Sequence, residues 1–352
     1  MVGTMHILDD IDSIRKTDRH SMLRAISSRP TQIRDSFKII NSIDIPKSSV
    51  KNIVAVGMGG SSLPSDMLKA WLLENTGSCM DVWRDYGFPF IGGRDTLVIA
   101  VSYSGNTEET IDAMQSAAAK GCAIIGISSG GKLEEICRNS GYCHLKIPTG
   151  LPPRAASGYL FSLQSLVLEK LGLCSISEEL RETADLLDGM LPNLNQSRPL
   201  SDNIAKKIAV SLVNRTPVIY GSGILAPVAR CWQAYFNENS KVLAWSGIIP
   251  EMNHNEIVGW VECGCAENYL PIILNSDNEP ASVKKKKSVL RELIFARMEK
   301  IIDVDSKGAS GSARLLSTSW TGEFASVYLA ILRGIDPTPV NAIESFKKKI
   351  RQ

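Results

Sequence analysis

Two short apolar segments in the first half of the chain each end in a loop of small and hydroxylated residues. Segment 52–57 (Asn-Ile-Val-Ala-Val-Gly) runs into Met-Gly-Gly-Ser-Ser, and segment 96–101 (Thr-Leu-Val-Ile-Ala-Val) runs into Ser-Tyr-Ser-Gly-Asn-Thr. Continuous apolar runs of this length, bounded by turn residues, are typical of strands buried on both faces. Helical patterns follow both loops, so the sequence predicts a parallel sheet whose strands are joined by helical crossovers.

The same alternation continues along the chain. We expect further strands at 80–83, 122–127, 216–223, 241–245, 270–274 and 300–304. We expect helices over 66–73, 107–120, 132–139, 157–171, 177–190, 227–236 and 321–332. The strand at 216–223 also ends in Gly-Ser-Gly, which suggests an internal duplication in which only the first half keeps a serine-rich loop. The lysine run 284–287 has no motif around it and is interpreted as a solvated loop.

The length of 352 residues exceeds what one hydrophobic core usually serves, so two domains are expected. Residues 1–45 carry apolar side chains at helical spacing and are interpreted as an N-terminal helical arm. We place the first domain at 46–200 and the second at 201–352. The predicted fold class is α/β, with two doubly wound, flavodoxin-like parallel-sheet domains packed together.

Composition argues against several classes of partner. The 39 basic and 37 acidic side chains give a net charge of +2, so nucleic acid is not expected as a partner. An apolar run of about 18 residues would be needed to span a bilayer, and neither such a run nor a secretory signal is evident, so we expect a cytoplasmic protein. The eight cysteines are interpreted as reduced thiols, and Cys263 and Cys265 lack the further ligands of a zinc site.

The two loops predict an anion site. Backbone N–H groups at a helix start attract anions, and parallel strands bring their carboxyl ends to one edge of the sheet. Either loop alone could equally be an ordinary turn or helix cap, but the pair favours a phosphate site. Because the loops lack a cluster of lysine or arginine, they suit one phosphomonoester better than a triphosphate. The candidate phosphate ligands are Gly59, Gly60, Ser61, Ser102, Ser104 and Thr107.

These loops, Gly-Met-Gly-Gly-Ser-Ser and Ser-Tyr-Ser-Gly-Asn-Thr-Glu-Glu-Thr, resemble those of the sugar isomerase (SIS) domain. Over residues 50–350 the chain resembles the bifunctional phosphoglucose/phosphomannose isomerases, a branch of the phosphoglucose isomerase superfamily with two SIS domains. The resemblance implies an aldose-ketose isomerase of glycolysis and gluconeogenesis. Such an enzyme interconverts glucose 6-phosphate, and mannose 6-phosphate as a second substrate, with fructose 6-phosphate through a cis-enediolate, and needs no cofactor or metal.

The resemblance also implies the catalytic residues. Glu238, in Asn-Glu-Asn-Ser-Lys, corresponds to the base, and Arg154, in Pro-Arg-Ala-Ala, to the cation that faces the enediolate. His254, in Asn-His-Asn, corresponds to the ring-opening histidine that reaches the site of the neighbouring subunit, which implies a homodimer. Lys347, in the C-terminal segment, corresponds to the lysine that joins this histidine at the ring oxygen.

Other interpretations stay open from the residues alone. Glu238 could be a solvated helix-end residue, Arg154 a surface residue and Lys347 part of a basic tail. Thr338 is the candidate for substrate specificity near C2, although ungapped counting from the final lysine gives Val340 instead. The alternatives for function are another SIS isomerase, of amino-sugar or pentose phosphates, or a non-catalytic sugar-phosphate sensor. His6, His20 and His144 are expected to be structural, with His20 in a charged helix.

Overall fold

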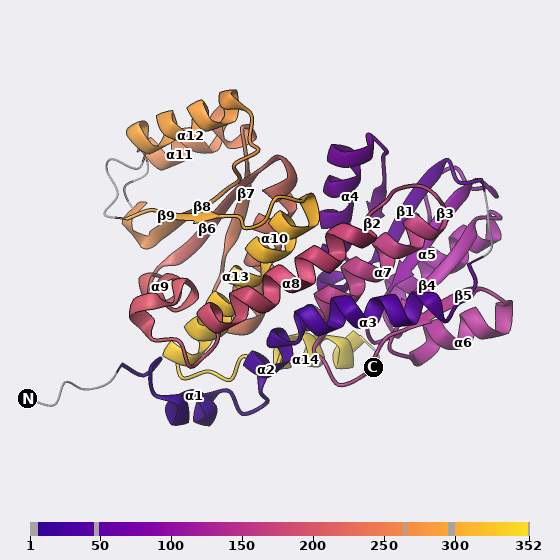
Figure 1. Ribbon diagram of the computed structural model, residues 1–352, viewed down its shortest axis with the longest axis horizontal. Helices are drawn as coiled ribbons and strands as arrows, with labels where there is room; N and C mark the ends of the chain where they lie inside the picture. The colour runs from indigo at the N-terminus through magenta and orange to yellow at the C-terminus, as the bar shows by residue number, and fades with distance from the viewer. Residues whose placement is uncertain (1–5, 46–48, 263, 265, 295–299, 351–352) are drawn as a thin grey trace, which may run out of the picture.

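The computed structural model describes residues 6–45, 49–262, 264, 266–294 and 300–350. Two parallel sheets lie at opposite ends of the molecule, with long helices between and beneath them (Figure 1). The first sheet has five strands in the order β2-β1-β3-β4-β5, and the second has four in the order β7-β6-β8-β9. The predicted α/β class with two parallel sheets is therefore confirmed.

The first sheet is built from the strands that the apolar runs predict, because their alternate side chains enter two different cores. Val54 and Val98 face a smaller core with helix α5, whereas Ile53 and Leu97 face the main core. The elements of this half are β1 (Asn52–Gly57), α4 (Leu63–Thr76), β2 (Asp81–Trp83), β3 (Thr96–Val101), α5 (Glu108–Ala119), β4 (Ala123–Ser128), α6 (Gly131–Ser140), β5 (Cys143–Lys146), α7 (Ser157–Lys170) and α8 (Ser177–Leu194).

The second sheet has α11 and α12 on one side and α9 and α13 on the other (Figure 1). Successive side chains along its strands again face two different cores. Ile219 and Ile272 face the main core, while Tyr220 and Ile273 face α12. The elements of this half are α9 (Ile204–Ser211), β6 (Thr216–Ser222), α10 (Ala226–Tyr235), β7 (Trp245–Ile249), α11 (Glu256–Glu262), β8 (Tyr269–Asn275), α12 (Ala281–Leu293), β9 (Ile302–Asp305), α13 (Gly311–Leu332) and α14 (Asn341–Ile350).

Three expectations for local structure are wrong. The strand predicted at 241–245 begins only at Trp245, because α10 continues into a π-helical turn that ends at Lys241 in a left-handed conformation (φ 53°). The lysine run 284–287 is helical rather than a loop, and Lys287 lies on the buried face of α12. His20 lies in the turn between α1 (Ile11–Thr17) and α2 (Met22–Ser27) rather than in a helix.

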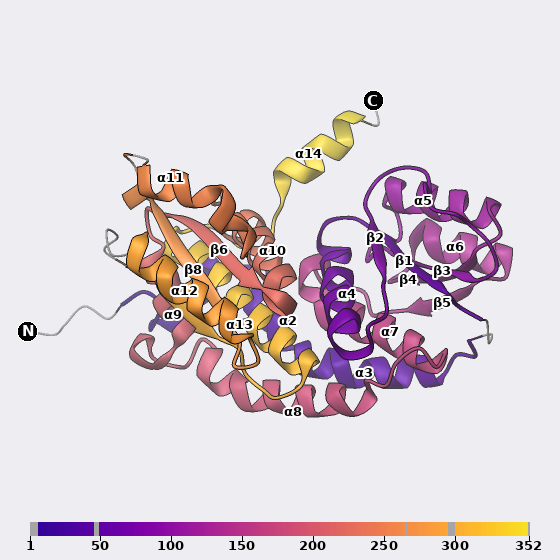
Figure 2. The ribbon, with the colours of Figure 1, turned by 90° about the horizontal axis from the view of Figure 1, so that it is seen from above.

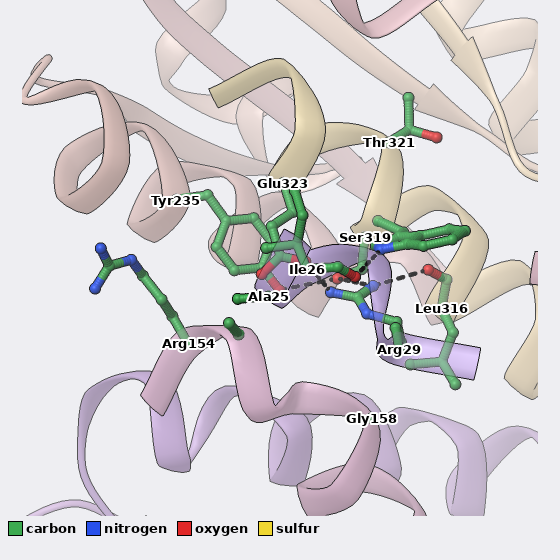
Figure 3. Close-up of polar contacts among 12 residues, drawn as sticks. Ala25, Ile26, Arg29, Arg154, Gly158, Tyr235, Leu316, Ser319, Thr321 and Glu323 are labelled. Atoms are coloured by element: carbon green, nitrogen blue, oxygen red, sulfur yellow. Dashed lines mark hydrogen bonds and ion pairs between the residues drawn. The ribbon is translucent and has the colours of Figure 1, made fainter. Parts of the chain in front are cut away.

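The N-terminal helices pack into the main core and reach both halves of the chain. Helix α3 (Arg29–Asn41) lies against α7 and α8, and the close approach to α7 occurs at Gly158, where a Cβ would lie 2.8 Å from Gln32 Oε1. The Arg29 Nη2 atom donates to Glu323 Oε2 at 2.5 Å, and both side chains are buried (Figure 3). This ion pair joins the N-terminal segment to α13.

Helix α14 differs from the other long helices, because it projects from the body of the molecule (Figure 2). Each of its residues is exposed, although Ile343, Phe346 and Ile350 share one face of the helix. The exposed fraction of Phe346 is 64%. Among the described residues, none of the helices is both long and apolar enough to cross a membrane.

Candidate active site

The two predicted phosphate loops lie side by side at the carboxyl ends of β1 and β3. Gly59, Gly60 and Ser61 form a 3-10 turn, η1 (Gly59–Ser61), and the other loop spans 102–107. The backbone N–H of Tyr103 donates to Ser61 Oγ at 3.0 Å, which joins the loops directly. The structure therefore brings the six candidate phosphate ligands to one edge of the first sheet.

The loop 102–107 has a fixed shape with accessible polar groups. The hydroxyls of Ser102 and Thr107 are 2.9 Å apart, and Thr107 is the N-cap of α5. Gly105 has φ 67°, and a Cβ there would lie 1.7 Å from the carbonyl oxygen of Gly130, so only glycine fits. Ser104 is exposed, and its Oγ accepts from Asn106 N at 3.2 Å. An anion at this edge would face hydroxyls and the positive end of a helix.

Arg154 lies on a turn that packs against the first of these loops. A Cβ on Gly60 would lie 3.1 Å from the Cα of Arg154, so the absence of a side chain permits the contact. The Tyr103 hydroxyl accepts from Leu151 N at 2.8 Å and donates to the carbonyl oxygen of Pro148 at 3.0 Å. The phosphate loops and the 3-10 turn η2 (Pro153–Ala156) that carries Arg154 are thus fixed together.

The Arg154 guanidinium is buried, with 3% of the residue exposed, and it reaches the second half of the chain. Its Nε donates to Asn239 Oδ1 at 2.6 Å, and its Nη1 lies 3.2 Å from Glu238 Oε2. Its Nη2 donates to the carbonyl oxygens of Pro337 at 2.9 Å and Thr338 at 3.0 Å. Burial lowers the pKa of Arg154, whereas Glu238 and Glu323 act to raise it.

Glu238 lies in the π-helical turn η5 (Phe236–Ser240), and a quarter of its side chain is exposed. The wider turn leaves the neighbouring Asn239 and Ser240 buried and bonded to α13. Asn239 Nδ2 donates to Ser326 Oγ at 2.9 Å, and Ser240 Oγ donates to the Ser326 carbonyl at 2.6 Å. The turn therefore presents the Glu238 carboxylate while α13 holds both residues that follow it.

Lys241, the next residue along, was not singled out by sequence reasoning. Its ammonium donates to the carbonyl oxygens of Glu238 at 2.7 Å and Pro337 at 2.9 Å. Burial, with Arg154 as the next cause, lowers the pKa of Lys241 to about 8. Lys241 therefore links the turn that carries Glu238 to the segment whose carbonyls hold Arg154. Its only sequence signal is its place in the Asn-Glu-Asn-Ser-Lys segment.

Two more residues that stabilise the site carry no comparable sequence signal. The carboxylate of Asp336 accepts from Thr338 N at 3.1 Å and lies 2.7 Å from His20 Nδ1. Asp336 therefore fixes the segment whose carbonyls hold Arg154. Behind the site, the buried Glu323 lies beside Arg29, with Arg154 on the neighbouring turn (Figure 3). Burial raises the pKa of Glu323 to about 7, against the opposing effect of Arg29 and Arg154.

A cavity of about 690 Å³ opens beside Glu238. It is lined by residues of the π-helical turn and of the segment that leads into α14, among them Glu238, Lys241, Asp336, Val340 and Ile343. Val340 thus contacts the cavity, whereas the Thr338 hydroxyl is buried and has no hydrogen-bond partner among the described residues. The phosphate loops do not line this cavity.

His254 and Lys347 are not brought to this centre within one chain. His254 is exposed on the 3-10 turn η6 (Glu251–His254) that follows β7, and Lys347 is exposed on α14. In the described part of the chain, hydrogen bonds join neither residue to Glu238 or Arg154. The amide of Asn255 donates to Glu251 and accepts from Glu256 N, and does not orient the imidazole.

Among the described residues, side chains that could hold a metal ion do not cluster. Cys263 and Cys265, considered above for zinc, lie outside the described residues. A carboxylate, a buried guanidinium and a loop pair for an anion support acid-base and electrostatic chemistry.

Family models match both halves of the chain. Residues 48–172 match the SIS domain, and residues 201–350 match the bacterial phospho-glucose isomerase C-terminal SIS domain. Among solved structures, the C-terminal domain of a glucosamine-fructose-6-phosphate aminotransferase from Francisella tularensis aligns with a TM-score of 0.71 at 16% identity. That alignment covers 90% of this chain and 98% of the other, and it shows the fold alone.

Curated relatives cover nearly the whole chain. A bifunctional phosphoglucose/phosphomannose isomerase from Caldicellulosiruptor bescii is 35% identical over 94% of this chain and 99% of its own length. Its counterpart from Thermoplasma acidophilum is 34% identical over 85% and 89%. A D-glucosamine-6-phosphate 4-epimerase from Sulfolobus acidocaldarius is 34% identical over 67% and 72%. With both halves matched and the isomerases aligned almost end to end, the chain belongs to the family of the bifunctional phosphoglucose/phosphomannose isomerases.

Proposed function

We propose that the protein is an aldose-ketose isomerase that interconverts glucose 6-phosphate, and also mannose 6-phosphate, with fructose 6-phosphate. The observation that carries this proposal is the pairing of Glu238 with the buried Arg154, on a turn that packs against the phosphate loops. A phosphate gripped at the sheet edge would hold one end of the sugar. The carboxylate and the guanidinium would then face the other end, where the proton moves.

In this mechanism Glu238 removes the proton from C2 of the open-chain aldose and returns it to C1. The electron pair of the broken C–H bond forms the C1–C2 double bond, and the negative charge collects on the oxygens of the cis-enediolate. Because C2 is planar in this intermediate, glucose 6-phosphate and mannose 6-phosphate lead to the same species. Reprotonation at C1, together with transfer of the O2 hydroxyl proton to O1, gives the ketose, so neither a redox partner nor a cofactor is needed to balance the step.

The hydrogen bonds of Arg154 leave one donor for that intermediate. A guanidinium has five N–H groups. Nε and both hydrogens of Nη2 are directed at Asn239, Pro337 and Thr338, and one Nη1 hydrogen is directed at Glu238. The second Nη1 hydrogen has no partner among the described residues and would donate to the enediolate oxygen. Because the other four bonds fix the guanidinium, stabilising this charge requires little reorganisation.

The ring-opening residues would come together in a homodimer. His254 would enter the site of the neighbouring subunit and act with Lys347 at the ring oxygen, since one chain alone leaves both exposed. The unpartnered apolar face of α14, formed by Ile343, Phe346 and Ile350, supports an interface there. A second copy that covers this face would also surround the cavity beside Glu238, which Ile343 lines.

We place the enzyme in the cytoplasm. The described cysteines, which include the exposed Cys79 and the buried Cys231, are free thiols, as expected in a reducing compartment. Thr338 remains the candidate for substrate specificity near C2. In support of an indirect role, its carbonyl holds Arg154 and its buried hydroxyl lacks a partner among the described residues, so a bound water could be held there.

The decisive assay follows fructose 6-phosphate formation from glucose 6-phosphate and mannose 6-phosphate in parallel, with a chelator present. D-glucosamine 6-phosphate is added as a third substrate, because an epimerase relative acts on it. We expect turnover of both hexose phosphates that the chelator does not reduce. Binding without turnover would indicate a sensor, and turnover of the amino sugar alone would replace the proposed reaction with chemistry at C4.

A further inference from the structure

The second sheet has a counterpart of the first phosphate loop. Strand β6 holds the place in its sheet that β1 holds in the other, with neighbours on each side. It ends in Gly-Ser-Gly, and Gly223 has φ 51°, compared with φ 52° at Gly59. Both glycines open a 3-10 turn that leads into a helix. The two halves therefore fold alike at the point where the first half offers an anion site.

The loop 102–107 also has a counterpart in the second half. Residues 102–107 connect β3 to α5, and the loop 276–280, one residue shorter, connects β8 to α12. The strands β3 and β8 pair with β1 and β6 in parallel, so both loops lie at the carboxyl edge of their sheet. The loop of the second half keeps one serine, Ser276, and carries a glutamate, Glu279, that the first loop lacks.

The Glu279 carboxylate points into the protein, where three donors surround it. Its Oε1 accepts from Ser222 Oγ at 2.7 Å, from Lys287 Nζ at 2.6 Å and from Ser276 N at 3.3 Å. The exposed fractions are 3% for Ser222 and 5% for Ser276. The side chains of Lys287 and Glu279 are 3% and 7% exposed. The hydroxyl, the backbone N–H and the ammonium are the kinds of donor that bind phosphate oxygens.

We propose that Glu279 is a built-in anion that occupies the second half's counterpart of the phosphate site. It closes that site in the native chain, so the first half alone binds the sugar phosphate. A buried lysine needs a negative partner, and Lys287 has this one at 2.6 Å. Removal of the carboxylate would leave a buried cationic pocket that takes a small oxyanion, such as formate or inorganic phosphate.

The test is chemical rescue of Glu279→Ala, followed by thermal unfolding. The variant should melt several degrees below the native protein, because Lys287 loses its partner. Formate at about 50 mM should then raise its Tm by several degrees more than chloride at equal ionic strength, and it should not do so for the native protein. In titrations with inorganic phosphate, the variant should bind one more equivalent per chain than the native protein.

Two further variants make the result specific. Glu279→Gln keeps the volume of the side chain, so it should be destabilised but not rescued by formate. Glu279→Ala combined with Lys287→Met should lose the rescue, because the cation is gone. A missing formate effect in Glu279→Ala, or an equal effect in the double variant, would overturn the proposal. If Glu279→Ala is recovered only when formate or phosphate is present, the proposal is supported. Since isomerase activity is not the readout, failure here leaves the proposed function standing.

Discussion

The Nη1 atom of Arg154 lies 3.2 Å from the Oε2 atom of Glu238, although the two residues are separated by 84 positions in the chain. Arg154 follows the first sheet, and Glu238 lies in the π-helical turn that follows α10. Their pairing means that the candidate catalytic centre exists only when the two halves are docked. Any change that loosens the contact between the halves should therefore reduce turnover more than it reduces phosphate binding.

Glu238→Gln should abolish isomerisation, with kcat reduced about 10²–10⁴-fold, because the amide cannot accept the C2 proton. Phosphate binding should be nearly unchanged, since in the described part of the chain the loops at 59–61 and 102–107 form no hydrogen bond with this carboxylate. The measurements are steady-state turnover and calorimetric binding of inorganic phosphate. Glu344→Gln on the exposed α14 is the matched control. Near-normal turnover in Glu238→Gln would rule out this residue as the base.

Sequence reasoning located the sheets well because their strands are continuous apolar runs that end in glycine or serine. It was wrong at Lys241, because the apolar pattern of 241–245 predicts a strand from its own residues alone. The π-helical turn before it was not predicted, and the strand begins only at Trp245. It also misassigned Lys287, since a lysine run looks solvated until a buried carboxylate from another loop is known.

For the site, the phosphate loops could be predicted because their ligands are contiguous in sequence. The hydrogen bonds that fix Arg154 could not, because Asn239, Pro337 and Thr338 come from segments far from it in the sequence. The roles of His254 and Lys347 stay predictions. Both lie on surfaces of a single chain, and only a second copy could complete the arrangement that the family resemblance implies.

Asn239→Ala should lower kcat about tenfold to a hundredfold while KM changes little. Its Oδ1 accepts from Arg154 Nε at 2.6 Å, so its loss frees the guanidinium to rotate without removing any substrate contact. Ser326→Ala removes the bond that Asn239 donates and the bond from the Ser326 hydroxyl to the Glu323 carbonyl, but it leaves the bond from Asn239 to Arg154, so it should have a smaller effect on kcat. Steady-state kinetics of both variants test this order. A raised KM with unchanged kcat would show that Asn239 does not position Arg154.

The rate should fall on the alkaline side with an apparent pKa near that of Lys241, which burial lowers from 10.5 to about 8. Loss of the proton removes the positive charge and one of the three N–H groups of the ammonium, which weakens its bonds to the carbonyls of Glu238 and Pro337. Lys241→Arg should move the alkaline fall in rate to higher pH, because a guanidinium stays charged. The pH profiles of kcat/KM for the two proteins provide the comparison.

Deprotonation of Lys241 should lower the rate at alkaline pH, but it should raise the free energy of unfolding. Its folded pKa lies below its ordinary value, so the unfolded chain binds more protons between about pH 8 and 10.5. The contribution of Lys241 to the free energy of unfolding therefore rises with pH across this window. Lys241→Arg should flatten that rise in thermal unfolding scans. An unchanged alkaline limb together with an unchanged unfolding profile would contradict the assignment of a lowered pKa.

Phe346→Ser should dissociate the proposed dimer, because Phe346 lies between Ile343 and Ile350 on the exposed apolar face of α14. Light scattering after gel filtration measures the mass. Lys348→Ser is the matched control, since this residue lies on the opposite face of the same helix. Turnover should fall with dissociation. A fully active dimer of Phe346→Ser would show that this face is not the interface.

Mixed dimers test whether His254 crosses to the neighbouring subunit. Glu238→Gln chains lack the base, and His254→Ala chains lack the ring-opening imidazole, so each homodimer should be nearly inactive. In a hybrid, one of the two sites combines a native Glu238 with a native His254 only if the histidine comes from the other subunit. Unfolding and refolding an equal mixture should therefore restore up to about a quarter of native activity, because half the dimers are hybrids with one intact site each. Differently tagged chains measure hybrid formation directly. If hybrids form and activity does not return, each chain supplies both residues to its own site, and the shared site is wrong.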